Sequence, residues 1–275
     1  MFIKFMRVLK MTRDEFDEHI LRIQLDGYTV LPGVLTSDEC DQARQELEGL
    51  SEKKVWLGNL FNKARVFERV YQIPPLLEVI RHFLGQDAVL SGVYGSILHS
   101  GSGGGGLHSD GSITGPNRLD SLAPVDNNRR ITSHVLAFNV IFCISNFTKT
   151  NGATRVVPGS YKYQALSVPP SPVYGERIVE AERGSTLIFN INTWHGASEN
   201  SAGETRYALF TPWRRQWLRG ESELSRIVEP EVLDRAGEEG KRVFGLSALS
   251  PYLDLSQWDR ESGCPKSEWS HLQRG

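Results

Sequence analysis

The sequence predicts a mainly β protein with flanking helices, built on a double-stranded β-helix core of the jelly-roll, cupin-like type. Three observations favour this fold. Amphipathic helical segments open the chain, and many short strand-like runs separated by turns follow them. One of those runs is apolar on both faces, as expected for a central strand that is buried on each side. At 275 residues, a barrel with helical additions can form a single domain, and we expect residues 1–275 to do so.

Composition and charge narrow the classes of function. A formal net charge of −2 gives no reason to expect nucleic acid or an anionic membrane as a partner. The three cysteines are widely spaced without a C-x-x-C pair, which argues against a disulfide scaffold or a thiolate metal site. Basic residues interrupt the apolar start of the chain, and no run reaches the length of a membrane span. We therefore expect a cytoplasmic protein.

The N-terminal part, residues 12–84, is predicted to be a helical scaffold. Capping boxes at 12–15 and 36–39 each begin an amphipathic helix, because a Thr and a Glu three residues apart can satisfy each other's backbone amides. The second helix runs to about residue 50. A proline pair begins a third helix at roughly 75–84, and a short strand is expected at 28–31 between the first two helices.

The jelly-roll core is expected at residues 89–214. Its strand-like runs are 89–98, 135–144, 154–157, 178–179, 184–190 and 206–211. A long polar loop is expected at 111–131. Residues 215–275 form an extension with one helix, around 230–236, that packs on the core or on a partner subunit.

A glycine-rich segment at 100–106 contains the pattern G-x-G-x-x-G. This pattern indicates a dinucleotide site only when a helix begins directly after it, so that the helix N-terminus faces the pyrophosphate. Here no helix start follows, and we reject a dinucleotide site. We expect a flexible loop that becomes ordered over an active site.

The sequence that directly follows this segment contains candidate metal ligands. His108 and Asp110 are two residues apart, so both side chains leave the same face of an extended backbone. His195, in the sequence Thr-Trp-His-Gly, supplies a second imidazole. Two histidines and one carboxylate form the facial triad of non-haem Fe(II) oxygenases, which leaves part of the metal open. An H-x-D tripeptide alone is a weak signal, but Arg206, eleven residues after His195, makes coincidence less plausible.

Arginine binds a carboxylate through two parallel hydrogen bonds. Arg206 therefore suits the far carboxylate of a keto diacid such as 2-oxoglutarate, whose other end would bind the metal; a surface arginine is the equally weighted alternative. Asn139 is the single polar residue of the central run, and it is either a satisfied core amide or a contact to a ligand. His99, His134 and Trp194 are the candidates for substrate contact, against a structural role as the default.

Together these residues resemble the phytanoyl-CoA dioxygenase (PhyH) family of Fe(II)/2-oxoglutarate oxygenases over roughly residues 12–214. The matching segments are, in order, 26–35, 108–110, 151–160, 195–196 and 206. The resemblance implies a jelly-roll core, iron held by His108, Asp110 and His195, and 2-oxoglutarate held by Arg206. It further implies that O2 and 2-oxoglutarate are turned over to succinate and CO2 as a substrate C–H bond is oxidised, with ascorbate as an optional reductant.

The chain departs from the family pattern in places. Ala197 stands where members often carry a serine that helps hold the co-substrate, and Ser198 or Asn139 is expected to take that role. The usual PGSH is Pro-Gly-Ser-Tyr here, ending at Tyr161. Related halogenases carry a small residue at the position of Asp110, so a carboxylate there favours hydroxylation, desaturation or another oxidative rearrangement.

The substrate is expected to be a small natural-product intermediate, because no basic cluster indicates a site for the phosphates of coenzyme A. Two other functions remain open at this stage. Zinc also accepts three protein ligands with an open position, so a zinc-dependent hydrolase or lyase on the same barrel is one alternative. A non-catalytic, cupin-like binding protein is the other. A homodimer is compatible with either function.

Overall fold

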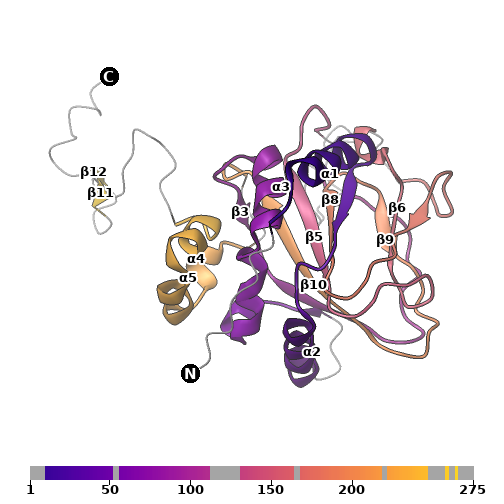
Figure 1. Cartoon of the computed structure of the whole chain (residues 1–275), viewed down its shortest axis with the longest axis horizontal. Helices are drawn as coiled ribbons and strands as arrows, with labels where there is room; N and C mark the ends of the chain where they lie inside the picture. Colours follow the sequence, from indigo (N-terminus) through magenta and orange to yellow (C-terminus); the bar gives the residue numbers. More distant parts are fainter. Residues whose placement is uncertain are drawn as a thin grey trace, which may run out of the picture.

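The computed structural model describes residues 10–51, 56–111, 131–163, 168–218, 222–246, 258–259 and 264–265. Its core consists of two antiparallel sheets, with helices outside one of them (Figure 1). This is the mainly β jelly-roll core with flanking helices that the sequence predicted. Within the described residues, no helix combines the length and the apolar character needed to cross a membrane. That the chain forms one oxygenase domain stays a prediction.

The larger sheet, called the major sheet below, has seven strands. From one edge to the other its path is β1 (Tyr28–Leu31), β8 (Thr186–Asn190), β5 (Ala137–Cys143), β10 (Arg206–Arg214), β4 (Tyr94–Leu98) and β2 (Trp56–Leu57), and β3 (Val89–Leu90) pairs with the far end of β10. The strands β1 and β2 come from the part of the chain expected to be helical scaffold, so the sheet combines both parts of the chain.

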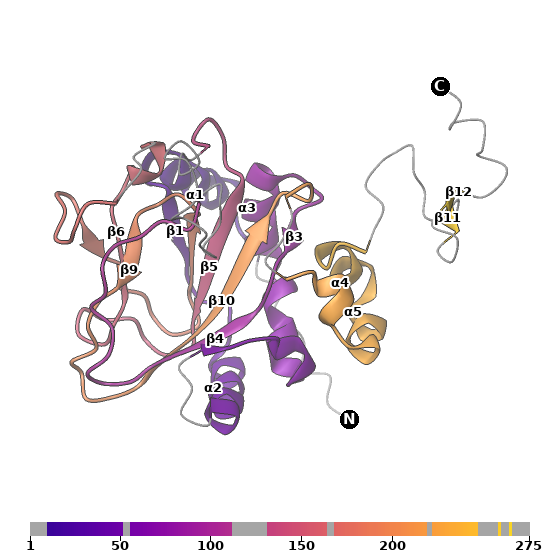
Figure 2. The same ribbon diagram turned by 180° about the vertical axis from the view of Figure 1, so that it is seen from behind.

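The smaller sheet, called the minor sheet below, has the strand order β7 (Arg177–Ile178), β6 (Thr154–Val156) and β9 (His195–Ala197). An isolated antiparallel bridge between His108 and His195 extends it by one more short segment beside β9. Figure 2 shows β6 and β9 on the side of β10 that lies away from the C-terminal helices.

Three long helices come from the N-terminal part: α1 (Arg13–Asp26), α2 (Ser37–Ser51) and α3 (Pro74–Leu84). Both predicted capping boxes form, because the hydroxyl of Thr12 accepts from the amide of Glu15 at 3.3 Å and that of Thr36 from the amide of Glu39 at 3.2 Å. Buried side chains of all three helices pack with those of the major sheet in one large apolar cluster. The helices therefore cover the face of the major sheet that points away from the minor sheet.

The central strand β5 is buried on both faces, as its sequence predicted. Phe138, Val140 and Phe142 belong to the apolar cluster shared with the helices. Ile141 points the other way and packs against a small cluster of both sheets, which includes Val156. Successive side chains of β5 thus point alternately to the helices on one face of the major sheet, the helix side, and to the minor sheet on the other, the minor-sheet side.

The strand predicted at 89–98 is instead two strands, β3 and β4. Leu90 pairs with Trp213 and Tyr94 with Phe210, so three residues of one strand lie opposite two of the other. An extra residue of this kind is a β-bulge, which interrupts the ladder. Gly92 lies in this segment, and a glycine inside a strand-like run is a typical sign of a bulge, which the prediction of one continuous strand did not take into account.

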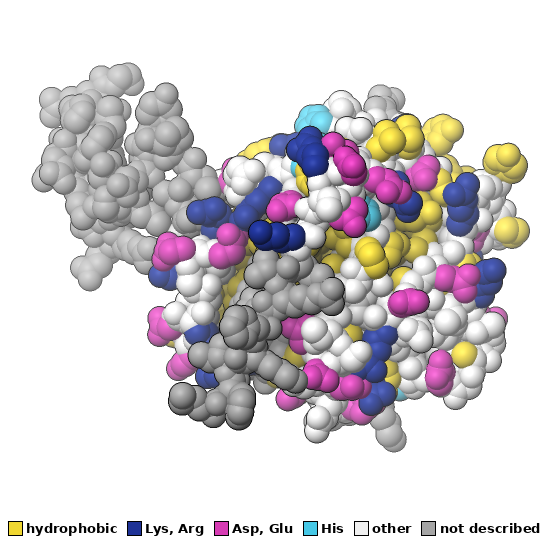
Figure 3. All heavy atoms as spheres, viewed as in Figure 1, with side chains coloured by type: hydrophobic (Ala, Val, Ile, Leu, Met, Phe, Trp, Pro, Cys, Tyr) yellow, Lys and Arg dark blue, Asp and Glu magenta, His cyan; other side chains and the backbone are white. Residues whose placement is uncertain are grey.

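The remaining described elements are short apart from one helix. They are η1 (Leu60–Asn62), η2 (Arg65–Tyr71), η4 (Ser160–Lys162), α4 (Leu224–Ile227), α5 (Pro230–Val243), β11 (Trp258–Asp259) and β12 (Cys264–Pro265). The helix expected at 230–236 continues to Val243 across a kink, where Gly237 takes a φ of 64°. The loop expected at 111–131 lies almost entirely outside the described residues. Over the described part of the face in Figure 3, acidic and basic side chains are interspersed.

Candidate metal centre

Backbone pairing brings the three predicted ligands together. The amide of His108 donates to the carbonyl of His195 at 2.8 Å, and the amide of His195 donates back at 2.9 Å. Two residues later, the amide of Asp110 donates to the carbonyl of Ile191 at 3.1 Å. The segment that carries His108 and Asp110 therefore runs beside β9 and the residues that precede it, although the two segments are far apart in sequence.

The ligand atoms of His108, Asp110 and His195 all lie within 4.8 Å of one another. Nε2 of His108 is 3.7 Å from Asp110 Oδ1, and Nε2 of His195 is 3.4 Å from Asp110 Oδ2. The two imidazole rings have centroids 4.2 Å apart. One ion placed among them can contact two nitrogens and one oxygen, and this donor set suits a divalent transition metal such as Fe(II).

The protonation states fit metal binding as well. Burial and the nearby His195 lower the pKa of His108, which favours the neutral ring. Burial acts to raise the pKa of Asp110, but the hydrogen bond and charge of His195, the charge of His108 and the amide of Asn139 together lower it. A neutral imidazole and an ionised carboxylate are the forms that ligate a metal.

Two neighbours orient the ligands. Nδ1 of His195 lies 2.9 Å from the carbonyl oxygen of Thr193, which can only accept a hydrogen bond, so Nδ1 donates to it and Nε2 is the nitrogen available to a metal. The amide nitrogen of Asn139 donates to Asp110 Oδ2 at 2.7 Å, which fixes the carboxylate. Asn139, expected to be either a core amide or a contact to a bound ligand, thus contacts Asp110, one of the predicted metal ligands.

Arg206 is a buried cation without a counter-ion among the described residues. Its side chain lies on β10 and the residue is 5% exposed. Nη1 donates to the carbonyl of Gly152 at 3.0 Å and Nη2 to the hydroxyl of Ser96 at 3.1 Å, while the guanidinium carbon lies 4.7 Å above the ring of Phe147. Nε is buried and has no hydrogen-bond partner in the part of the chain that the structure describes. Burial lowers the pKa of Arg206 to about 10.

The triad and Arg206 line one cavity of about 650 Å³ between the two sheets. The apolar part of its wall consists of Trp56, Leu98, Ile141, Phe189, Ala208 and Phe210. Its polar part includes Ser96, Ser102, Asn139 and Thr154. A larger, more open hollow of about 860 Å³ lies between α1, α3 and α5, away from the triad. The less open cavity is the one that contains the His-Asp-His cluster together with the buried Arg206.

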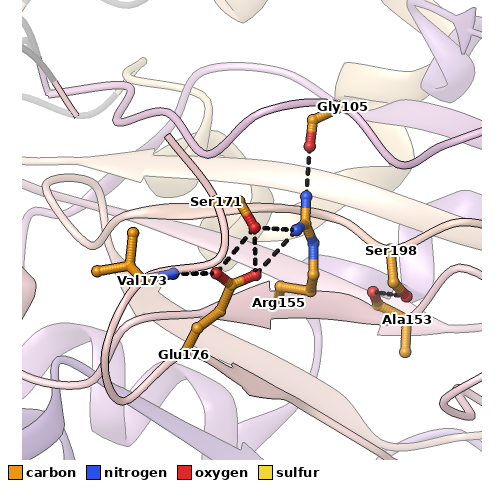
Figure 4. Close-up of polar contacts among 7 residues, drawn as sticks. All are labelled: Gly105, Ala153, Arg155, Ser171, Val173, Glu176 and Ser198. Atoms are coloured by element: carbon orange, nitrogen blue, oxygen red, sulfur yellow. Dashed lines mark hydrogen bonds and ion pairs between the residues drawn. The ribbon is translucent and has the colours of Figure 1, made fainter. Parts of the chain in front are cut away.

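Four other predicted site residues do not line this cavity in the described part of the chain. The hydroxyl of Ser198 donates to the carbonyl of Ala153 at 2.8 Å (Figure 4). Trp194 is buried in a separate apolar cluster. His99 lies 3.3 Å from the hydroxyl of Thr205, and His134 lies 2.9 Å from that of its neighbour Ser133. A co-substrate role for Ser198 and substrate contacts for the other three have no support from this geometry.

Sequence reasoning missed other cavity residues, chiefly Ser96, Thr154, Trp56 and Phe210. Phe210 has a signal, because it follows Arg206 by four residues and so shares its face of the strand. Ser96 becomes visible only through the register of β4 on β10, where it pairs with Ala208. Trp56 lies on a two-residue strand that has no period in sequence.

The chain is similar to a known protein family and to several of its relatives. The model of the family described as phytanoyl-CoA dioxygenase (PhyH) matches residues 23–208. An uncharacterised protein of Mycobacterium tuberculosis is 26% identical over 164 residues, or 59% of this chain, and the match spans 56% of that protein's length. Dioxygenase af480 of Aspergillus fumigatus is 28% identical over 245 residues, which cover 81% of this chain and 74% of the relative.

Solved structures share the fold. HygX from Streptomyces hygroscopicus, with nickel and 2-oxoglutarate bound, matches with a TM-score of 0.63 and 19% identity over 80% of this chain and 95% of HygX. The epimerase SnoN, in complex with Fe3+, alpha ketoglutarate and nogalamycin RO, matches with a TM-score of 0.59 and 15% identity over 74% of this chain and 85% of SnoN.

Proposed function

The chain belongs to the phytanoyl-CoA dioxygenase family, and from that premise we propose that it is an Fe(II)/2-oxoglutarate-dependent dioxygenase that oxidises a small, uncharged and largely apolar molecule. The family is the one that the sequence motifs predicted. One observation carries the proposal: a buried arginine without a counter-ion among the described residues shares a cavity with a His-Asp-His cluster.

Each protein group has a distinct task in this function. Fe(II) would be held by His108, Asp110 and His195, and it supplies, with 2-oxoglutarate and O2, the oxidising power for C–H cleavage with release of succinate and CO2. Arg206 would bind the far carboxylate of 2-oxoglutarate, because its unpartnered Nε gives it a free donor. Ser96 holds Nη2 of that arginine and so sets the plane of the guanidinium.

A second residue is needed to contact 2-oxoglutarate. Ala197 has no polar side chain and Ser198 does not line the cavity, so another polar residue must take this role. Thr154 lines the cavity and lies on β6 directly opposite Ala197. We assign to its hydroxyl the role that a serine at position 197 has in related members. Asn139 is not assigned this role, because its amide nitrogen already donates a hydrogen bond to Asp110.

The substrate class follows from the rest of the wall. Among the described residues that line the cavity, the metal triad and Arg206 are the only ones that carry a charge or can titrate near neutral pH. Trp56 is 57% exposed and meets Phe210 edge-on, with ring centroids 6.2 Å apart, at one end of the cavity. Such rings favour a flat apolar molecule, and they carry no positive charge that would bind an anionic group. A natural-product intermediate fits this wall, and the fungal relatives named dioxygenases support an oxidative reaction.

The test is an anaerobic titration of the protein with Fe(II) and then 2-oxoglutarate. We expect the weak visible absorption band of a metal-bound keto acid, and Asp110→Ala is expected to abolish it. An unchanged band in that variant removes Asp110 from the site. Activity restored by Zn(II) but not by Fe(II) favours a hydrolase or lyase instead. Absence of succinate formation over a broad panel of neutral substrates favours a binding protein. A cytoplasmic location and a homodimer stay predictions.

A further inference from the structure

Arg155 links three segments of the chain close to the metal centre. It lies on β6, where it pairs with Gly196 of β9. Its Nη1 donates to the hydroxyl of Ser171 at 2.7 Å and to Glu176 Oε1 at 2.8 Å, and its Nη2 donates to the carbonyl oxygen of Gly105 (Figure 4). One guanidinium thus connects β6, the loop before β7 and the glycine-rich segment.

The path of the Arg155 side chain requires the glycine that follows His195. A Cβ atom at Gly196 would lie 3.4 Å from Nη2 of Arg155 and 3.0 Å from the carbonyl oxygen of Gly106. The contact with the Gly106 carbonyl is tight and that with Arg155 is at the limit of ordinary van der Waals contact, so a larger residue at 196 would crowd the glycine-rich segment and touch the arginine. The absence of a side chain on β9 lets the guanidinium reach across the strand.

The other end of the guanidinium is firmly anchored. The side chains of Arg155 and Glu176 are 13% and 12% exposed. Glu176 also accepts from the hydroxyl of Ser171 and, at 3.0 Å, from the amide of Val173. Three donors therefore fix the carboxylate, and the carboxylate fixes the arginine.

The glycine-rich segment needs such a support. Its first part is tied to the chain after β9, because the amide of Gly101 donates to the carbonyl of Asn200 at 2.7 Å and the amide of Asn200 donates to that of Ser102 at 2.8 Å. Its end is tied by the bridge of His108 to His195. No main-chain to main-chain hydrogen bond of the described residues involves residues 103–107. The bond from Arg155 falls inside this gap, three residues before His108.

We propose that Arg155 is a positioning residue, which holds Gly105 and thereby sets the orientation of His108 in the metal site. The inference deepens the proposed function and rests on it in one respect, namely that His108 binds a metal. Ser102 and Gly103 line the cavity, so the same support also keeps one wall of the site in place.

An arginine-to-lysine change separates this role from a merely structural ion pair. A lysine at 155 keeps its charge beside Glu176, but a single ammonium group cannot also reproduce the fork that reaches Gly105. Arg69 provides a matched control on the helix side. It donates to Glu39 Oε1 at 2.8 Å and to the carbonyl of Gln72 at 2.6 Å, and the side chains of Arg69 and Glu39 are 17% and 28% exposed.

The experiment uses the full-length protein and the variants Arg155→Lys, Arg155→Gln and Arg69→Gln. Hydrogen exchange of the metal-free protein is followed at the amides of His108 and His195, and Co(II) alone is titrated as the metal probe. In both Arg155 variants we expect exchange at these amides to be about ten times faster and Co(II) binding about ten times weaker, a typical loss for a residue that supports a metal ligand. Arg69→Gln should change neither, and Arg155→Lys should melt close to the parent protein.

Two results overturn the proposal. One is an Arg155→Lys protein with parental exchange and Co(II) affinity, whatever the Arg155→Gln protein does, because the ion pair then has a structural role alone. The other is faster exchange across the whole chain with no excess at His108 and His195. Failure of the proposed function has a different signature, in which the parent protein binds neither Co(II) nor 2-oxoglutarate. The exchange at His108 still tests the role of Arg155 in that case.

Discussion

The two sides of the cavity are stabilised by different interactions. On the helix side of the major sheet, large apolar side chains such as Phe138, Phe142 and Trp213 are completely buried in one cluster with the helices. The minor sheet has strands of only two or three residues. Polar groups hold its surroundings, among them the Arg155–Glu176 pair and the buried amide of Asn200, which donates to two carbonyl oxygens at 2.8 Å.

This difference separates the stability of the fold from the geometry of the site. His108 and His195 belong to the minor-sheet side, whereas Arg206 and Asn139 lie on the major sheet. Apolar burial is non-directional and gives most of the folding free energy, while hydrogen bonds fix positions at a modest net gain. We therefore expect changes on the two sides to have different readouts.

The largest effect is expected on the helix side. Phe142→Ala leaves a cavity in the apolar cluster and should lower the free energy of unfolding by about 4 kcal/mol, measured by urea denaturation. Trp56→Ala, at a residue that is 57% exposed, serves as the control and should change it by less than 1 kcal/mol. Equal losses in the two variants would mean that the apolar cluster is not the main source of stability.

Arg206 should show the opposite behaviour, with a loss of binding and no loss of stability. Arg206→Gln removes a buried charge that has no counter-ion among the described residues, so unfolding should need at least as much urea as in the parent. Binding of 2-oxoglutarate to the Fe(II)-loaded protein should weaken about 100-fold, or about 2.7 kcal/mol. An unchanged affinity would remove Arg206 from the co-substrate site.

A smaller effect is expected for the neighbour of the metal ligand. Asn139→Leu keeps the branched shape of the side chain but loses the hydrogen bond to Asp110 Oδ2. Binding of Co(II), followed by its visible absorption, should weaken about tenfold. The matched substitution Asn146→Leu, at an exposed residue outside the cavity lining, is the comparison. Equal affinities in the two variants would show that the carboxylate needs no support from the major sheet.

The smallest effect is a pH-dependent one on the minor-sheet side. Burial acts to raise the pKa of Glu176, but the amide of Val173, the hydroxyl of Ser171 and the charge of Arg155 together lower it from its ordinary value of 4.5. A lowered pKa in the folded state stabilises the protein above the ordinary value, and this stabilisation is lost as the pH falls through the folded value.

Glu176→Gln should therefore unfold about 1 kcal/mol more easily than the parent at pH 7. The difference should stay constant down to the ordinary pKa of a glutamate and shrink below it. Urea denaturation of both proteins across this range is the measurement. A difference that grows toward acid pH contradicts the assigned direction of the shift.

The sequence was informative where a local rule determines the structure. Capping boxes predicted two helices, the apolar run predicted the central strand, and the H-x-D and H-G patterns pointed to residues that the backbone brings together. His99 and Trp194 were candidates for substrate contact, His99 because it stands beside the glycine-rich segment. Both residues stand just outside a strand, His99 after β4 and Trp194 before β9, and neither lines the cavity in the described part of the chain, so nearness in sequence to a site segment was not enough.

Register was the part that the sequence did not reveal. Ser96 reaches Arg206 only because β4 pairs with β10 in one alignment, and the residue that sets this alignment lies in the bulge between β3 and β4. Trp56 and Thr154 lie on strands too short to show a period. A pattern of hydrophobic residues shows which face of a strand is buried, but it does not show which residue of the next strand lies opposite.

The bulge at 91–93 also bears on how such an enzyme diversifies. With it, Tyr94, Ser96 and Leu98 lie opposite Phe210, Ala208 and Arg206. If the same residues paired one to one with β10 and formed no bulge, Val93, Gly95 and Ile97 would lie in these places instead. The bulge thus decides whether a hydroxyl or an aliphatic side chain lies beside the arginine, without any substitution in the pocket itself.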